Sequence, residues 1–270
     1  MRLTALLRTA TLLAIAAASH SAWADRDALW KIIDTQCVPE AIAGQKPAPC
    51  SRVQMTPDRD HGWVVLKDRK GVLQYLLMPT ARIGGMESPE PERPDAPNYF
   101  AQAWRARDLL DQLNGSPVPR DVLSLTINSQ KRRSQDQLHI HISCTQREMR
   151  ARLLAAQDEI GSGWAPLPGN WVGHVWFVRR VETETLDGFN LFADVADHVP
   201  GASRDISQVT IGAVAANFSN GKNGFVLMAS IFNPADPSSG SSEDDIQDHS
   251  CAIIRPAAAA AAAPATTPAP

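Results

Sequence analysis

The stretch Leu138-His139-Ile140-His141-Ile142-Ser143-Cys144 decides the fold, because apolar and polar residues alternate along it without a break. Alternation with a period of two predicts a β-strand whose faces meet different surroundings. One face carries His139, His141 and Ser143, spaced about 6.5–7 Å apart. The residues of the other face are expected to pack into the core: Leu138, Ile140, Ile142 and Cys144.

Further strands are expected around this one. The apolar run Val122–Ile127 precedes it, and the polar loop 128–137 joins the two into an antiparallel ribbon. An earlier hairpin is predicted from Trp63–Lys67 and Val72–Met78, which flank the turn Asp68-Arg69-Lys70-Gly71. Later strands are expected over 174–181, 209–215 and 225–232.

Apolar residues at helical spacing predict helices around 29–33, over 98–113, near 147–157 and near 185–195. Residues 79–97, rich in Pro, Gly and Glu, predict a long surface loop. Helices between pairs of neighbouring strands favour an α+β fold on an antiparallel sheet. The strand-helix-strand-strand order recurs in the second half, so a degenerate internal duplication is a further hypothesis.

The composition is that of an ordinary globular protein. The chain has 270 residues, 44% of them apolar, which is enough for one sizeable core or two small ones. Its net charge of −3 and isoelectric point near 6.2 lack the dense positive surface that nucleic acid requires. We therefore expect no nucleic-acid partner.

The two ends differ in composition from the middle. Residues 1–24 combine Arg2 and Arg8, a short apolar stretch and Ala22-Trp23-Ala24, which is typical of a cleaved secretory signal. A retained N-terminal anchor is the alternative. Residues 256–270 are mostly alanine and proline and predict a disordered tail. One domain over 25–255 is expected between them.

Four cysteines agree with export, because disulfides persist outside the cytosol. The spacing lacks any C-x-x-C pair and argues against a metal cluster. We favour a Cys37–Cys50 bridge, which would close a short proline-rich loop, and this leaves Cys144 with Cys251. Four buried free thiols remain the alternative.

Three interpretations of the histidine pair compete. A neutral imidazole can attack phosphorus, form a phosphoramidate and release the group to water. Alternatively, the H-x-H strand can give two ligands to zinc, which needs a third protein ligand. The candidates for that ligand are His61, His174, His198 and His249. The third interpretation is a pair of histidines that only form hydrogen bonds at a sheet face.

The loop and strand Asn128-Ser129, Ser134-Gln135 and His139-Ile140-His141-Ile142-Ser143 resemble the histidine-triad superfamily. A closer resemblance, to CDP-diacylglycerol pyrophosphatases, covers nearly the whole chain after residue 24. Its motifs are Leu76-Leu77-Met78-Pro79-Thr80, Arg82-Ile83, Glu87-Ser88, Leu125-Thr126-Ile127-Asn128-Ser129, His139–Cys144, Arg179-Arg180-Val181 and Ile246-Gln247-Asp248-His249-Ser250-Cys251.

This resemblance implies a histidine-triad-like sheet and hydrolysis of CDP-diacylglycerol to CMP and phosphatidate through a nucleotidyl-histidine. With Gln135 as the anchor, His141 takes the middle, nucleophilic position, and Ser143 replaces the third histidine. A second alignment to the three histidine positions of the superfamily places Gln137 at the first position, His139 at the central one and His141 at the last. The resemblance also implies a location in the periplasm or on the periplasmic face of the inner membrane, where the lipid substrate lies.

The remaining site residues are assigned by their chemistry. Asn128, Ser129, Gln135 and Ser143 can donate hydrogen bonds to phosphoryl oxygens. Cations for the anionic oxygens are expected from Lys67, Arg82, Arg179 and Arg180. Because such donors can replace an ion, we expect neither a metal nor a cofactor.

Two functions from other classes remain open. One is a non-catalytic periplasmic protein that binds a nucleotide or lipid, although mere binding does not need paired imidazoles. The other is a pyrophosphatase of soluble nucleotides, which the export signal disfavours. The sequence leaves the acyl-chain preference and the oligomeric state open.

Overall fold

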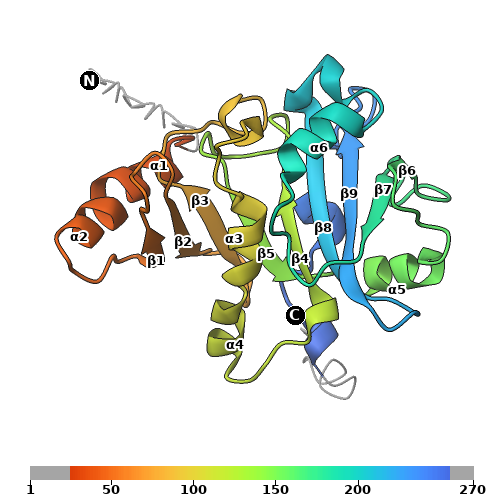
Figure 1. Ribbon diagram of the computed structural model, residues 1–270, viewed down its shortest axis with the longest axis horizontal. Helices are drawn as coiled ribbons and strands as arrows, with labels where there is room; N and C mark the ends of the chain where they lie inside the picture. The colour runs from red at the N-terminus through yellow and green to blue at the C-terminus, as the bar shows by residue number, and fades with distance from the viewer. Residues whose placement is uncertain (1–24, 256–270) are drawn as a thin grey trace, which may run out of the picture.

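The computed structural model describes residues 25–255, and its centre is one sheet of nine antiparallel strands. The strand order is β1-β2-β3-β5-β4-β8-β9-β7-β6 (Figure 1). The strands are β1 (Cys50–Gln54), β2 (Trp63–Lys67), β3 (Tyr75–Pro79), β4 (Leu123–Ile127), β5 (Ile140–Cys144), β6 (Ala165–Pro166), β7 (Phe177–Val181), β8 (Val209–Asn217) and β9 (Asn223–Ile231). The predicted α+β fold on an antiparallel sheet is confirmed.

Helices cover both faces of this sheet. They are α1 (Ala28–Ile32), α2 (Val38–Ile42), α3 (Tyr99–Arg105), α4 (Asp108–Asn114), α5 (Arg147–Ala156), α6 (Leu191–His198) and α7 (Ser242–Ile246), and a π-helical turn, Ile33–Cys37, joins α1 to α2. Short 3-10 turns occupy Glu90–Glu92, Arg120–Val122, Ala202–Arg204, Ile206–Gln208 and Ala252–Ile254. In Figure 1, α1 and α2 lie at one end of the sheet and α5 at the other.

Alternation along the strands divides the apolar residues between the two faces. The largest cluster joins one face to α3, α4 and α6, and Ile140, Ile142 and Cys144 belong to it as predicted. On the opposite face, Val64, Leu66, Leu76 and Met78 pack with the N-terminal helices. A third cluster on that face packs Val214 and Met228 against α5 and α7. The second face therefore has two apolar ends with a gap between them.

Buried polar residues fill this gap. They come from β5, β4 and β8, where Thr126 pairs with His141 and Ser124 pairs with Ser143. Thr210 continues the polar row on β8, and its hydroxyl donates to the carbonyl oxygen of Ile127. A polar strip at the middle of a sheet needs hydrogen-bond partners because buried polar groups without them are costly. Helix α7 provides one for Thr210 through the Ser242 N–H, whereas the hydroxyls of Ser124 and Thr126 have no partner among the described residues.

Several sequence-predicted boundaries differ from the structure. The helix expected over 98–113 is two helices, because the chain turns between Arg105 and Asp108. The helix expected near 185–195 is Leu191–His198, because the Asn190 side chain caps it by accepting hydrogen bonds from Phe192 and Ala193. The edge strands β1 and β6 and the five-residue helix α7 were not predicted. The internal duplication stays a hypothesis.

Both favoured disulfides are present, Cys37–Cys50 and Cys144–Cys251. The second ties the end of β5 to the C-terminal segment across a sequence separation of 107 residues. The described residues contain no helix long and apolar enough to cross a bilayer. The predicted signal or anchor (1–24) and the tail (256–270) lie outside the described residues.

Replacing Cys144 and Cys251 together by alanine is expected to lower the free energy of unfolding by about 4 kcal/mol, because a long loop is released in the unfolded chain. The Cys37–Cys50 disulfide closes only a short loop, so Cys37→Ala/Cys50→Ala should lower the free energy of unfolding by about 3 kcal/mol. Denaturant unfolding of both double variants measures the difference. An unchanged midpoint for the first pair would contradict the expectation.

Candidate active site

The two histidines lie side by side on the second face of the sheet, and both are buried. His141 belongs to β5, His139 directly precedes that strand, and their ring centroids are 4.9 Å apart. The exposed fractions of the two residues are 6% for His139 and 4% for His141. The prediction that both imidazoles share one face is therefore confirmed, and their surroundings decide what each can do.

The hydrogen bond of His139 fixes its tautomer. Its Nδ1 lies 2.6 Å from the carbonyl oxygen of Gln137, and a carbonyl can only accept, so Nδ1 carries the hydrogen. The lone pair is then on Nε2, which has no hydrogen-bond partner among the described residues. Gln137 is itself anchored, since its amide donates to the carbonyl oxygens of Pro79 and Ala81. His139 thus presents an uncharged nitrogen with a free lone pair.

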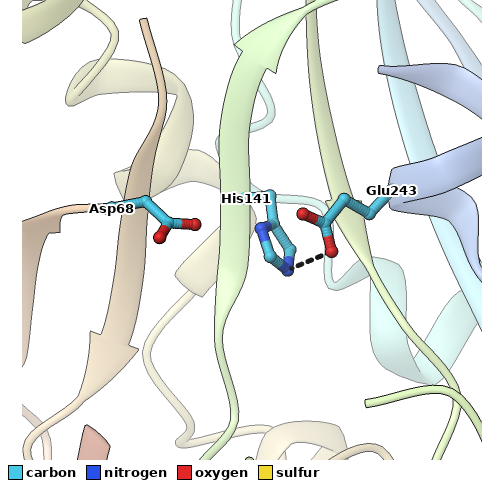
Figure 2. Close-up of side chains that lie close together, drawn as sticks. All are labelled: Asp68, His141 and Glu243. Atoms are coloured by element: carbon cyan, nitrogen blue, oxygen red, sulfur yellow. Dashed lines mark ion pairs between the residues drawn. The ribbon is translucent and has the colours of Figure 1, made fainter. Parts of the chain in front are cut away.

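His141 has a hydrogen-bond partner at Nδ1, whereas its Nε2 lies near a carboxylate without a hydrogen bond to it. The amide Nε2 of Gln74 lies 3.1 Å from its Nδ1, and Nε2 of His141 lies 3.3 Å from Oε2 of Glu243. Because an amide nitrogen donates, Nδ1 of neutral His141 accepts and Nε2–H faces the carboxylate. Figure 2 shows Glu243 on one side of this imidazole and Asp68 on the other.

A network of polar side chains surrounds Glu243. The Gln74 amide nitrogen lies 3.2 Å from Oε1 of Glu243 and 2.9 Å from Asp68, so these carboxylates and His141 share its two hydrogens, while its oxygen lies 2.5 Å from Nδ1 of His249. Asn128 donates to the other Glu243 oxygen over 3.0 Å. The carboxylate therefore has donors on both oxygens, which suits its ionised form.

Helix α7 brings Glu243 to the histidines. The hydroxyl of its N-cap residue Ser241 accepts from the Asp244 N–H and lies 2.8 Å from the Asp244 carboxylate and 3.2 Å from Oδ1 of Asn128, which accepts from the Glu243 N–H. The helix lies close to the sheet at Gly212, where a Cβ would overlap the side chain of Ile246. A loop at the end of β4 and a short helix over 100 residues later thus meet at one carboxylate.

Burial and neighbouring charges set the protonation states. Burial, with a smaller effect of His141, lowers the pKa of His139 to about 4. Burial also lowers the pKa of His141, although the Glu243 carboxylate opposes this effect. For Glu243, burial favours the protonated form, but His141, His249 and the two amide donors outweigh it and lower its pKa. At neutral pH the site holds an uncharged His139 beside an ionised Glu243.

The other predicted phosphate donors are placed unevenly. Asn128 joins the network, and Ser129 is buried next to it with a hydroxyl that has no partner. The Ser143 hydroxyl lies on the histidine face but donates to the carbonyl oxygen of Leu73. Gln135 is not brought to the histidines, because its amide binds the backbone of Asp25 and Leu29 at the start of α1.

All four predicted cations bind partners within the protein. Arg179 is on β7, separated from β5 by three strands, and pairs with Asp194 at 2.7 Å, so the structure does not place it at the histidines. Arg180 on the same strand pairs with Glu182. Arg82 pairs with Asp27, and Lys67 donates to the carbonyl oxygens of Asp68 and Gly71.

The geometry changes which residues could bind zinc. Among the described residues, the group whose donor atoms lie within 4.8 Å of one another is Asp68, His141 and Glu243, without His139. His249 does approach, with Nε2 3.5 Å from Glu243. The other three candidates pair elsewhere: His61 with Asp58, His174 with Asp245 and Asp236, and His198 with Asp194. The H-x-H strand thus offers one ligand to this group rather than two.

Comparisons with known proteins agree with the motifs quoted from the sequence. The family model described as CDP-diacylglycerol pyrophosphatase matches residues 24–255. A CDP-diacylglycerol pyrophosphatase of Yersinia pestis is 39% identical over 232 residues, which is 86% of this chain and 86% of that relative. The residues matched by the family model include the histidine strand and the segment that carries Glu243 and His249. The chain belongs to the CDP-diacylglycerol pyrophosphatase family.

Proposed function

We propose that this protein hydrolyses the pyrophosphate bond of CDP-diacylglycerol through a nucleotidyl-histidine and releases CMP and phosphatidate. Family membership supports the substrate and the reaction. The free lone pair of His139 beside the Glu243 network supports the mechanism. The same buried polar site makes a purely binding role the weaker proposal, since it holds an unprotonated imidazole without a partner for Nε2.

His139 is the nucleophile in this proposal, in agreement with the alignment that makes it the central histidine. Its Nε2 attacks the phosphorus of the CMP half, the N–P bond forms, and the bridging P–O bond breaks with its electron pair on phosphatidate. The hydrogen remains on Nδ1 and is donated to the Gln137 carbonyl oxygen. This hydrogen bond stabilises the positive charge that the ring acquires. Histidine suits this step because a neutral nucleophile is not repelled by phosphoryl oxygens.

Water then attacks the same phosphorus and displaces His139 as a neutral imidazole, which gives CMP. The water must lose a proton, and the ionised Glu243 next to His141 is the candidate acceptor. The N–H of His141 and the amide of Asn128 can donate to phosphoryl oxygens, where negative charge builds up. Phosphatidate leaves as a stabilised phosphate, so the first step needs little help from an acid. A missing third histidine is therefore tolerable.

The direct test is hydrolysis of CDP-diacylglycerol by the purified full chain in EDTA and in water enriched in ¹⁸O. Attack at the CMP phosphorus places the label in CMP, whereas attack at the other phosphorus places it in phosphatidate. Label only in phosphatidate, or no release of CMP, would reject the proposal.

Metal-assisted hydrolysis is the second candidate, because Asp68, His141 and Glu243 bring three potential ligand atoms together. The Gln74 amide nitrogen lies among the same three side chains, at 2.9 Å from Asp68, 3.1 Å from His141 and 3.2 Å from Glu243. A donor N–H group thus occupies the place that a cation would need. Activity that appears only when zinc is added after EDTA would favour the metal.

The pH dependence follows from the pKa of His139. Protonation removes the lone pair, so the reactive fraction rises with pH and reaches half at about pH 4. The first step should therefore stay near its maximum at pH 6 and fall about tenfold per pH unit well below pH 4. Single-turnover rates from pH 2.5 to 7, with circular dichroism as the check on folding, measure this limb. A midpoint near 6.5 would contradict the assignment.

The proposed location is the periplasm or the periplasmic face of the inner membrane. The secretory pattern of residues 1–24 and the two disulfides support it.

A further inference from the structure

Exposed apolar side chains gather beside the proposed active site. Val72 and Leu113 are 50% and 46% exposed, and both line one hollow together with Ile254 and Arg255. Val72 follows the β2–β3 turn, and Leu113 is in the last turn of α4. Both α4 and the described C-terminal end lie at the bottom of Figure 1. Exposed apolar groups that cluster in this way are typical of a binding surface.

Three exposed cations belong to the same region, one in the lining of the hollow and two in the turn before Val72. Arg69 and Lys70 are exposed in the turn just before Val72, and Arg255 is exposed at its rim. We call the six residues Arg69, Lys70, Val72, Leu113, Ile254 and Arg255 the basic-apolar patch. Basic side chains around apolar ones suit a surface with negative head groups above a hydrocarbon layer.

The patch is connected to the catalytic network through the backbone. The Val72 N–H donates to the carbonyl oxygen of His249 over 3.0 Å, and the next residue, Leu73, accepts from Ser143. A second hollow, lined by Gln247, His249 and Arg147, meets the first at Ser250. The two hollows together join the segment that carries His249 to Val72 and Leu113.

We propose that the basic-apolar patch is the surface that contacts an anionic lipid bilayer, so that the diacylglycerol half of the substrate points toward it. This inference rests on the proposed function for its substrate. The head-group phosphates face the hollow at His249, Val72 and Leu113 enter the interface, and the three cations lie at the level of the lipid phosphates.

Hydrogen exchange of the full chain tests the surface without using activity. Vesicles of phosphatidylglycerol should slow exchange in peptides that cover 68–73 and 109–116, while peptides that cover 171–176 stay unchanged. Neutral phosphatidylcholine vesicles should protect less, because the three cations lose their partners. Protection at 171–176, or no protection within the patch, would overturn the proposal.

Kinetics with a matched pair of variants tests its consequence. Val72→Asp/Leu113→Asp should lower the rate on CDP-dioleoylglycerol in anionic vesicles by roughly tenfold and leave the rate on water-soluble CDP-dibutyroylglycerol unchanged. The control, Val172→Asp/Val175→Asp, changes two exposed valines outside the patch and should leave both rates unchanged. An equal loss on both substrates, or the same loss in the control, would overturn the proposal. Wild type that cleaves neither substrate would reject the proposed function, and hydrogen exchange would still decide the surface.

Discussion

Replacing His139 by alanine is expected to lower CMP release from CDP-diacylglycerol by about 10⁴-fold or more, because the group that forms the covalent bond is gone. The side chain is buried, uncharged and bonded to Gln137 only through Nδ1, so the lone pair of Nε2 is not taken up by a hydrogen bond within the described residues. The matched change His141→Ala should lower the rate of CMP release by a smaller factor, since His141 supplies a hydrogen bond rather than the bond to phosphorus. Initial rates of both variants measure the difference.

Covalent trapping separates the roles of the two histidines. Rapid quenching into base with substrate labelled at the CMP phosphorus should leave the label on wild type and on His141→Ala but not on His139→Ala. His139→Gly opens space at the same position, and added imidazole should restore part of its CMP release. Label on His139→Ala would assign the role of nucleophile to His141, in agreement with the alignment that uses Gln135 as its anchor.

The histidine strand was the most predictable part of this protein. A period of two assigns Ile140 and Ile142 to one face and His139 and His141 to the other from the sequence alone, and the structure agrees. Asn128 was a candidate through the resemblance and its amide chemistry, and it joins the site directly after the strand that pairs with the histidine strand. These predictions depend on local geometry, which the alternation of side chains determines.

The carboxylate of the site could not be predicted in the same way. Glu243 is over 100 residues from His141 in the chain, and it reaches the site because α7 packs over β4 and β8. Two features of the sequence are related to this contact: Gly212, where α7 packs closely on β8, and the segment that ends at His249. Neither feature indicates its partner through a periodic pattern. The prediction for Gln135 has the opposite problem. Its position in the loop fitted a phosphate donor, but its side chain binds the start of α1.

Arg179 shows a related limit of sequence reasoning. A cation beside a recognised motif fits a role in substrate binding, but strand order decides which residues meet. Because β7 pairs with β9 and not with β5, Arg179 contacts Asp194 on α6 instead. Nothing in the local sequence of a strand reveals its neighbours in the sheet.

Replacing Glu243 by glutamine is expected to lower the turnover rate by about 10²-fold, the second-largest effect among these variants. The change keeps the shape but removes the charge that faces His141 at 3.3 Å. It also places a new N–H₂ group against the amide donors of Gln74 or Asn128. The water in the second step would lose its proton acceptor, so the covalent intermediate should accumulate.

The pKa of His141 gives an independent measure of the same change. The carboxylate stabilises the imidazolium form, so its loss should lower the pKa of His141 further, which an NMR titration of labelled histidine can follow. Asp244→Asn on the same helix is the control, because Asp244 is exposed and pairs with Arg132 rather than with a histidine. This control should keep the rate within about twofold. If Glu243→Gln lowered the rate without accumulation of the intermediate and without a shift of the His141 pKa, Glu243 would serve only to hold α7 in place.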